Sequence, residues 1–183
     1  MKYLYSLPVP FSGKRVSISV DMLQTDGGKN FLYETATVKN AVAVLPIMDN
    51  GDLVLLKNYR HPIKDSILEV PAGLIDDIDR LGSDKIEIEL KAAQRELKEE
   101  TGYTADEWSC AGEFYTSPGW TTEKVTLFVA KKLKAGVQEL EETEKDIIVV
   151  NTKLDKALFM IKHGAIKDMK TALLIQHYAA MKK

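Results

Sequence analysis

The chain has 183 residues, 45% of them hydrophobic and 28% charged, which is typical of one globular domain with a sizeable core. A formal net charge of -2 predicts no general attraction to nucleic acid or to anionic membranes. The single cysteine, Cys110, excludes an internal disulfide, and no apolar run reaches the roughly 18 residues of a membrane span. We therefore expect a cytoplasmic protein that binds neither nucleic acid nor a membrane.

The N-terminal part of the chain predicts strands joined by turns. Residues 15–22 and 31–38 alternate apolar and polar side chains, and the turn sequence at 25–28 predicts that they form a hairpin. The apolar runs 41–47 and 53–56 flank an Asp-Asn-Gly-Asp turn, which predicts two buried strands.

Two charged residues follow these strands. Arg60 ends one predicted strand, and Glu69 lies in the next short one. An arginine at the rim of a sheet can pair with a carboxylate or hold a phosphate group, because its fork of N–H donors matches both. The residues alone favour the ion pair.

A helix is predicted over residues 85–101. Asp84 can cap its first turn, with Glu87 completing a capping box, and Gly102 suits the left-handed residue that ends many helices. We expect its apolar stripe to be buried and the glutamates to lie on another face. The stripe consists of Ile86, Leu90, Ala93 and Leu97.

The end of this helix carries an unusual density of negative charge. Glu96, Glu99 and Glu100 fall within one and a half turns, and like charges at this spacing destabilise a helix by about 0.2–0.5 kcal/mol per pair. A hard divalent cation, Mg²⁺ or Mn²⁺, would compensate, since such ions take oxygen ligands. The alternative is a solvated acidic face on which Arg95 pairs with Glu99.

Residues 108–114 and 124–132 predict strands joined by a loop at 115–122. Two aromatic residues of this loop, Tyr115 and Trp120, are candidates either for stacking on a nucleobase or for the core, where large aromatic side chains are more common.

The last third of the chain begins with an acidic stretch at 139–146, which taken alone predicts a solvated charge run. A strand at 147–150 and helices at 153–163 and 168–181 follow. Strands around one helix, followed by terminal helices, predict an α+β fold, an α/β sandwich with a mixed sheet. The helix stripes expected to cover the sheet are Leu154, Ala157, Leu158 and Ile161, then Met169, Leu173, Leu174 and Tyr178.

Two stretches carry a resemblance to a known family. They read Glu-Val-Pro-Ala-Gly-Leu-Ile-Asp at 69–76 and Ala-Ala-Gln-Arg-Glu-Leu-Lys-Glu-Glu-Thr-Gly-Tyr at 92–103. Together they resemble the signature of the Nudix hydrolases, whose second half is present in full. With Tyr-Arg-His-Pro at 59–62, the chain is most similar to the ADP-ribose pyrophosphatase branch.

The first half of the signature departs from the usual spacing. Its first acidic residue is Glu87 when counted back from Arg95, but Asp79 when counted forward from Gly73. We therefore expect residues 79–86 to be an insertion in the loop, because added loop length costs little closure entropy.

The resemblance implies a Nudix fold, with a mixed β-sheet between helices. Residues 39–183 would form the hydrolase domain, and residues 1–38 a β-hairpin extension that joins two subunits in a homodimer. The implied reaction is metal-dependent hydrolysis of the pyrophosphate bond of ADP-ribose or a related nucleoside diphosphate sugar. The alternatives are a non-catalytic module that binds such nucleotides and a plain structural domain that binds neither nucleotide nor metal.

The resemblance also implies roles for single residues. Arg95 would hold the glutamates in place, and a glutamate of the acidic stretch, Glu144 or Glu142, would be catalytic together with Glu99. The implied metal ligands are Glu96, Glu99, Glu100, the carbonyl of Ala72 and Glu87. The implied substrate contacts are Arg60, Glu69, Ser117 and Gly119.

Overall fold

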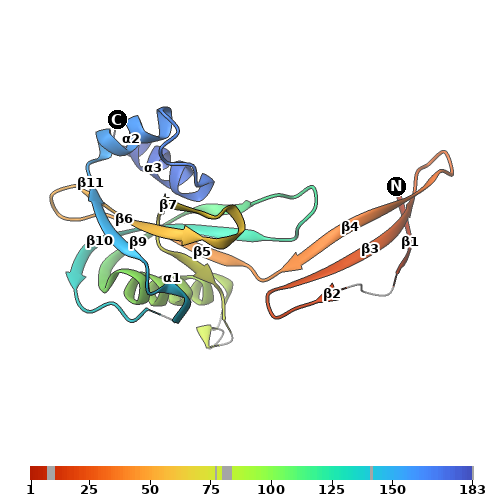
Figure 1. Ribbon diagram of the computed structural model, residues 1–183, viewed down its shortest axis with the longest axis horizontal. Helices are drawn as coiled ribbons and strands as arrows, with labels where there is room; N and C mark the ends of the chain where they lie inside the picture. The colour runs from red at the N-terminus through yellow and green to blue at the C-terminus, as the bar shows by residue number, and fades with distance from the viewer. Residues whose placement is uncertain (8–10, 77, 80–83, 141, 183) are drawn as a thin grey trace. The chain divides into compact units, whose positions relative to one another are not determined.

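The computed structural model describes residues 1–7, 11–76, 78–79, 84–140 and 142–182 (Figure 1). By their contacts, the residues fall into two compact units. The first unit contains Met1–Asn40 and Phe114–Val125, and the second contains Ala41–Glu113 and Thr126–Lys183.

The first unit is built around strand β3 (Val16–Gln24). This strand pairs antiparallel with β1 (Lys2–Ser6), β2 (Phe11–Ser12) and β4 (Asn30–Val38). The turn between β3 and β4 contains Gly28 with a φ of 81°, a conformation that favours glycine. The predicted hairpin is therefore confirmed.

Two further sheets lie mostly in the second unit. One has the strand order β8 (Ala72–Leu74), β5 (Ala41–Pro46), β10 (Lys124–Ala135) and β9 (Tyr103–Tyr115). The other has the order β11 (Ile148–Thr152), β6 (Leu53–Arg60) and β7 (Asp65–Glu69), with both pairings antiparallel. The runs predicted to be buried form β5 and β6, where residues 42–45 and 53–55 are fully buried.

Three α-helices among the described residues complete the second unit (Figure 1): α1 (Lys85–Thr101), α2 (Leu154–Lys162) and α3 (Met169–Met181). Helix α1 packs on β5 and β8, α3 packs on β5 and β7, and α2 packs against α3. Strand β5 thus lies between helices, and the predicted α+β sandwich is confirmed. No helix within the described ranges has the length and apolar character needed to cross a membrane.

The ends of α1 are as predicted, and its buried face is predicted in part, since Ala93 and Leu97 are buried. The Asp84 carboxylate accepts the Glu87 backbone N–H at 2.9 Å, and Gly102 ends the helix with a φ of 75°. Ile86, however, is exposed. Packing of the small residues Ala92 and Ala93 on the sheet brings neighbouring glutamates to the same face, since residues three and four apart are adjacent. The buried residues are Glu89, Ala92, Ala93, Glu96, Leu97, Glu100 and Thr101.

Helix α3 buries Leu174 and Tyr178 of the predicted stripe but not its other two residues. Its cap is Asp168, which accepts the Thr171 backbone N–H at 2.9 Å. Met169 and Leu173 are exposed, whereas the polar Thr171 is buried against Val70, the residue that follows β7. The buried residues are Thr171, Leu174, Ile175 and Tyr178.

Candidate active site

Three glutamates near the end of α1 define the candidate active site. Glu96 and Glu100 are buried, with only 7% and 2% of their surface exposed, whereas Glu99 is partly exposed. The prediction that the glutamates lie away from the buried face is therefore wrong for two of them. Burying carboxylates is costly unless cations or protons neutralise them.

Burial changes the pKa of both glutamates. It raises the pKa of Glu96 to about 7, although the neighbouring Arg95 guanidinium partly opposes this effect. It raises the pKa of Glu100 to about 9, with a further increase from the charge of Glu96. At neutral pH the pair therefore retains a proton unless a cation takes its place.

Arg95 is the positive group that faces these carboxylates. Its Nη1 donates to Glu96 at 2.8 Å and to Glu99 at 2.9 Å. Its Nε and Nη2 donate to the two oxygens of Asp79, and Nη2 also donates to the carbonyl of Leu74. Burial alone would lower the pKa of Arg95, but the hydrogen bonds to Asp79 and the charge of Glu96 raise it. The guanidinium thus ties two glutamates to the loop before the helix.

The structure separates the two candidates for the first acidic position of the signature. Asp79 is buried and binds Arg95 through both of its oxygens. Glu87 lies about 12 Å from Arg95 along the helix axis, and its carboxylate is 3.0 Å from the Lys91 ammonium. Asp79 is therefore brought to the other site residues, and Glu87 is not. Residues 80–83 of the expected insertion lie outside the described residues.

Strand β8 approaches the glutamates closely. The Ala72 backbone N–H donates to Glu100 Oε2 at 2.9 Å. A Cβ atom at Gly73 would overlap the Glu96 carboxylate, so only glycine permits this approach. Sequence reasoning gave Gly73 no role, although its place in the signature was a usable signal. Metal binding by the Ala72 carbonyl stays a prediction.

The two candidate glutamates of the acidic stretch, Glu142 and Glu144, have different surroundings. Both belong to the short helix η3 (Glu142–Glu144). Glu142 points to solvent and accepts a hydrogen bond from Lys145 at 2.6 Å. Glu144 is close enough to Glu96 and Glu100 for its charge to contribute to their raised pKa values. The structure thus brings Glu144, rather than Glu142, to the three-glutamate group.

Arg60 and Glu69 form the ion pair that the residues alone suggested. Arg60 Nε donates to Glu69 Oε2 at 2.7 Å. The Glu69 side chain is buried, and burial raises its pKa although the charge of Arg60 opposes this. The Arg60 side chain stays 41% exposed, so part of the guanidinium is accessible to a ligand. Contact of both residues with substrate stays a prediction.

The other predicted substrate contacts, Ser117 and Gly119, lie in the loop of the first unit. The Ser117 carbonyl accepts the backbone N–H groups of Trp120 and Thr121, and the Gly119 carbonyl accepts the Tyr33 hydroxyl at 2.6 Å. These bonds fix the loop against itself and against β4. Contact of Ser117 and Gly119 with substrate stays a prediction.

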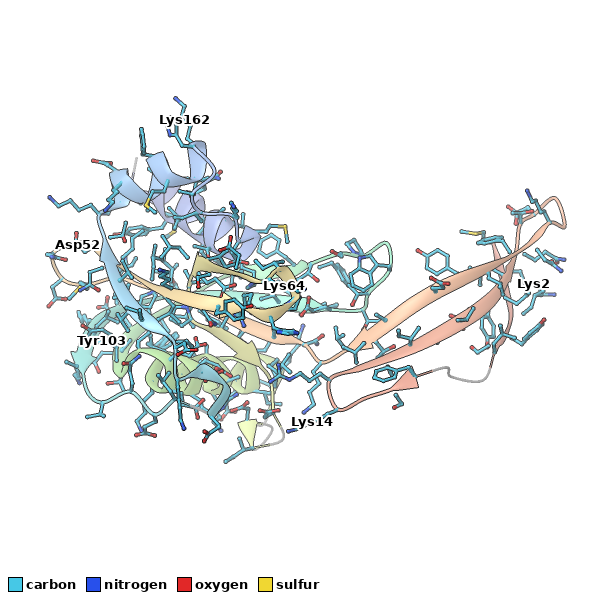
Figure 2. All side chains as sticks on the ribbon, viewed as in Figure 1. Lys2, Lys14, Asp52, Lys64, Tyr103 and Lys162 are labelled. Atoms are coloured by element: carbon cyan, nitrogen blue, oxygen red, sulfur yellow. The ribbon has the colours of Figure 1, made fainter. Side chains whose placement is uncertain are left out.

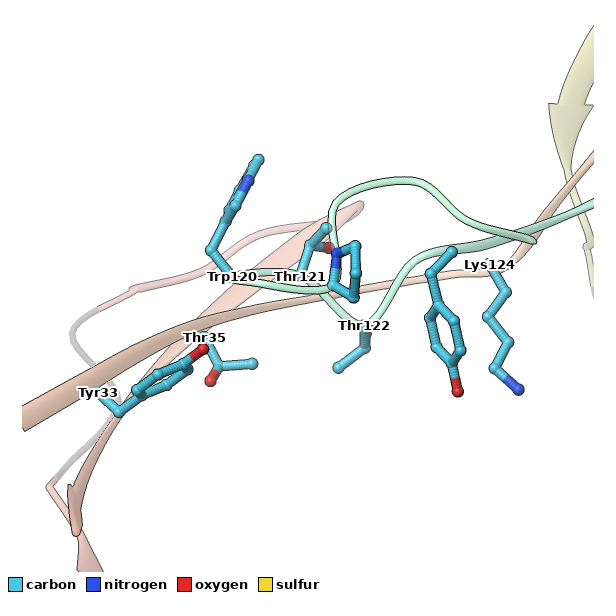
Figure 3. A pocket seen from close by; sticks show the side chains of 8 residues that line it. Tyr33, Thr35, Trp120, Thr121, Thr122 and Lys124 are labelled. Atoms are coloured by element: carbon cyan, nitrogen blue, oxygen red, sulfur yellow. The ribbon is translucent and has the colours of Figure 1, made fainter. Parts of the chain in front are cut away.

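A cavity of about 500 Å³ lies beside this loop (Figure 3). Its lining includes Tyr33 from β4, Lys124 from β10 and the two aromatic candidates of the loop. Trp120 and Tyr115 are 60% and 57% exposed, so the core alternative is wrong for both. The Lys124 ammonium lies 5.0 Å from the centre of the Tyr115 ring, within reach of a cation–π interaction.

The chemistry of the three glutamates fits a hard divalent cation. Two buried carboxylates with raised pKa values, joined by a third, provide oxygen ligands that an ion of charge +2 would neutralise. Within the described residues, no three acidic, histidine or cysteine side chains are arranged as a ready set of ligands. Glu96 and Glu99 turn to Arg95, and Glu100 turns to the Ala72 amide. These carboxylate oxygens are therefore the kind of ligand that a hard divalent cation takes. In this structure they accept hydrogen bonds from Arg95 and from the Ala72 backbone N–H.

Comparison with known proteins gives a family match over most of the chain. A family model described as NUDIX domain matches residues 37–164. The chain is 36% identical to the ADP-ribose pyrophosphatase of Bacillus subtilis (strain 168), over 91% of this chain and 86% of that protein. It is also 36% identical to the methanol dehydrogenase activator of Bacillus methanolicus, with the same coverage.

Two further matches extend the comparison. The chain is 30% identical to the GDP-mannose pyrophosphatase of Cronobacter sakazakii (strain ATCC BAA-894), over 88% of this chain and 85% of that protein. A crystal structure of an ADP compounds hydrolase matches with a TM-score of 0.83, over 98% of this chain and 92% of that one. At 21% identity, this structural match shows the shared fold alone.

Proposed function

Because the chain belongs to the Nudix family, we propose that it hydrolyses the pyrophosphate bond of ADP-ribose or a related nucleoside diphosphate sugar. The products are a nucleoside monophosphate and a sugar phosphate. Two relatives with at least 30% identity are named as pyrophosphatases of ADP-ribose and GDP-mannose. The observation that carries the proposal is the group of three glutamates, two of them buried, beside the guanidinium of Arg95.

Mg²⁺ or Mn²⁺ is the cofactor that we propose. Glu96, Glu99 and Glu100 would hold it, with the carbonyl of Ala72 as a further oxygen ligand, and Glu87 lies too far along the helix to join them. When bound, the cation neutralises the diphosphate and lowers the pKa of a water molecule. Arg95 orients Glu96 and Glu99 through its hydrogen bonds.

We assign proton transfer to Glu144, the glutamate of the acidic stretch whose charge reaches the three-glutamate group. Its carboxylate would take a proton from the attacking water. The exposed side of Arg60 would bind a phosphate oxygen, while Glu69 holds this side chain in place. Substrate contact by Ser117 and Gly119 is part of the same proposal.

The direct test replaces Glu100 by glutamine. Purified wild type should release AMP from ADP-ribose in the presence of Mg²⁺, and Glu100→Gln should lower kcat by about 100-fold or more, because a metal ligand is lost. Glu107→Gln is the matched control, since Glu107 is exposed on β9 and pairs with Lys132. Unchanged turnover in Glu100→Gln would remove the metal assignment.

The alternative is a module that binds the same nucleotides without cleaving them. Nucleotide binding that needs no metal and gives no product would favour it. The buried glutamates argue against a module that only binds nucleotides. Burying carboxylates costs free energy, and binding without catalysis does not require them.

We further propose a homodimer in which residues 1–38 act as the dimerisation extension of a hydrolase domain formed by residues 39–183. Tyr5, Met22 and Leu32 lie in register across β1, β3 and β4. Tyr5 and Leu32 are 51% and 54% exposed, and no residue of β3 is buried. The described part of this unit contains no helix that could cover its sheet (Figure 2). A second copy would cover this apolar row. A cytoplasmic location remains our expectation.

A further inference from the structure

Thr171, in the first turn of α3, makes two hydrogen bonds from a fully buried position. It is 0% exposed, and its hydroxyl donates to Asp168 Oδ2 at 2.6 Å. The Thr171 hydroxyl oxygen accepts the backbone N–H of Val70 at 2.8 Å. Asp168 also accepts from Lys170 at 2.7 Å, so the group that orients the hydroxyl is itself held.

The backbone that Thr171 holds leads directly into the candidate active site. The Pro71 carbonyl accepts the backbone N–H of Val44 at 2.9 Å, and the Ala72 backbone N–H donates to Glu100. Three successive residues, 70 to 72, are thus fixed by partners on α3, β5 and α1. Gly73 then lies against the Glu96 carboxylate with no room for a side chain.

We infer that Thr171 is a positioning residue for the metal and diphosphate site. Its hydroxyl keeps residues 70–73 in the position at which the Ala72 amide meets Glu100 and Gly73 meets Glu96. The metal-binding part of this inference rests on the proposed function, but the positioning of Ala72 does not.

Two substitutions of Thr171 separate the contribution of its hydroxyl group from the contribution of its packing. Valine has nearly the shape of threonine, so Thr171→Val keeps the packing of α3 but leaves the buried Val70 N–H without its acceptor. The strand can then shift away from Glu100. Thr171→Ser keeps the hydroxyl and loses only a methyl group, so it should restore the wild-type position.

The experiment compares Thr171→Val, Thr171→Ser and wild type, with Thr152→Val as the control. Thr152 is equally suited to a change to valine, because it is buried on β11 and lies outside the site. The first measurement is Mn²⁺ affinity by calorimetry. The second is amide hydrogen exchange of Ala72 in metal-free protein by NMR.

Thr171→Val should bind Mn²⁺ about tenfold more weakly or worse, the usual effect of losing a residue that supports metal ligands. Its Ala72 amide should exchange faster, whereas Thr171→Ser and Thr152→Val should match wild type in both measurements. Wild-type values in Thr171→Val, or equal losses in Thr152→Val, would overturn the inference.

Two outcomes would require a different measurement or a different variant. If wild type neither binds Mn²⁺ nor cleaves ADP-ribose, the proposed function fails, and the exchange of Ala72 alone decides the positioning role. If Thr171→Val does not fold, Asp168→Ala replaces it, since it keeps the hydroxyl but removes the group that orients it. Exchange of Ala72 that is no faster in Asp168→Ala would then contradict the inference.

Discussion

The burial of Glu100 lowers the stability of the metal-free fold at neutral pH, although the proposed metal site needs this carboxylate. Its pKa is raised by burial from 4.5 to about 9, so the folded state binds a proton more tightly than the unfolded state. The stability gained from this proton is full below pH 4.5 and is lost as the pH rises toward 9. A buried carboxylate that must ionise for function therefore weakens the metal-free protein at neutral pH.

Glutamine at this position should make the metal-free protein more stable. Glu100→Gln stays neutral and can still accept the Ala72 N–H, so we expect a gain of about 1–3 kcal/mol at about pH 8. The gain should shrink toward about pH 5, where wild type also carries the proton. Urea denaturation with a chelator measures both values. A gain of equal size at both pH values would contradict the assigned cause.

Glu144 and Glu142 provide a second comparison at the level of single residues. Glu144→Gln should lower kcat by about 10²–10⁴-fold, the range for a lost general base. Glu142→Gln should change kcat little, since Glu142 points to solvent beside Lys145. Steady-state kinetics with ADP-ribose and saturating Mg²⁺ decides between them. The reverse order of effects would move the proton-transfer role to Glu142.

Some residues of the candidate site could be identified from the sequence, and others could not. The three glutamates and Arg95 could be selected, because their spacing on one helix is a local property. Asp79 could not be chosen over Glu87, because that choice depends on the path of the loop between Gly73 and α1. The pairing of Asp79 with Arg95 exists only once the helix is packed on the sheet.

At the level of elements, α1 separates local signals from tertiary ones. Its start at Asp84 and its end at Gly102 were predicted, because capping depends on neighbouring residues alone. Its buried face was predicted only in part: Ala93 and Leu97 are buried as expected, but Glu96 and Glu100 share the side that meets β5 and β8. Hydrophobic periodicity assigns glutamate to solvent, and a site that buries charge violates this assumption.

Asp168, the N-cap of helix α3, predicts how the stability of the fold changes at acidic pH. Burial alone would raise the pKa of Asp168, but the Lys170 charge and the hydrogen bonds from Thr171 hold it below its usual value. The ionised carboxylate therefore stabilises the fold above about pH 4, and this contribution is lost as the pH falls through the lowered pKa.

Replacing this cap should accordingly cost stability at neutral pH. We expect Asp168→Ala to lose about 1–3 kcal/mol at about pH 7, the usual range for a helix cap with charged hydrogen bonds. The difference from wild type should narrow below about pH 4. Urea denaturation across this pH range tests it, and a constant difference at every pH would contradict the role of the charge.

At the level of the whole molecule, the apolar row on the first unit leads to a prediction about assembly. Leu32→Asp places a charge in the row formed with Tyr5 and Met22, and should convert a homodimer into monomers, because a buried unpaired charge opposes association. Analytical ultracentrifugation measures the mass. Thr37→Asp, at an exposed position near the other end of β4, is the control. Wild type that sediments as a monomer would contradict the dimer.

The sequence by itself determined the class of fold, the ends of α1, the leading hairpin and the helix that carries the acidic residues. These properties depend on periodicity, turns, caps and spacing, which act over a few neighbouring residues. Only the tertiary structure decided that Glu96 and Glu100 are buried, that Asp79 meets Arg95 and that Gly73 must lack a side chain. These depend on which distant backbone segments pack against α1, and the free energy of burying a charge is set by those segments rather than by the helix that carries it.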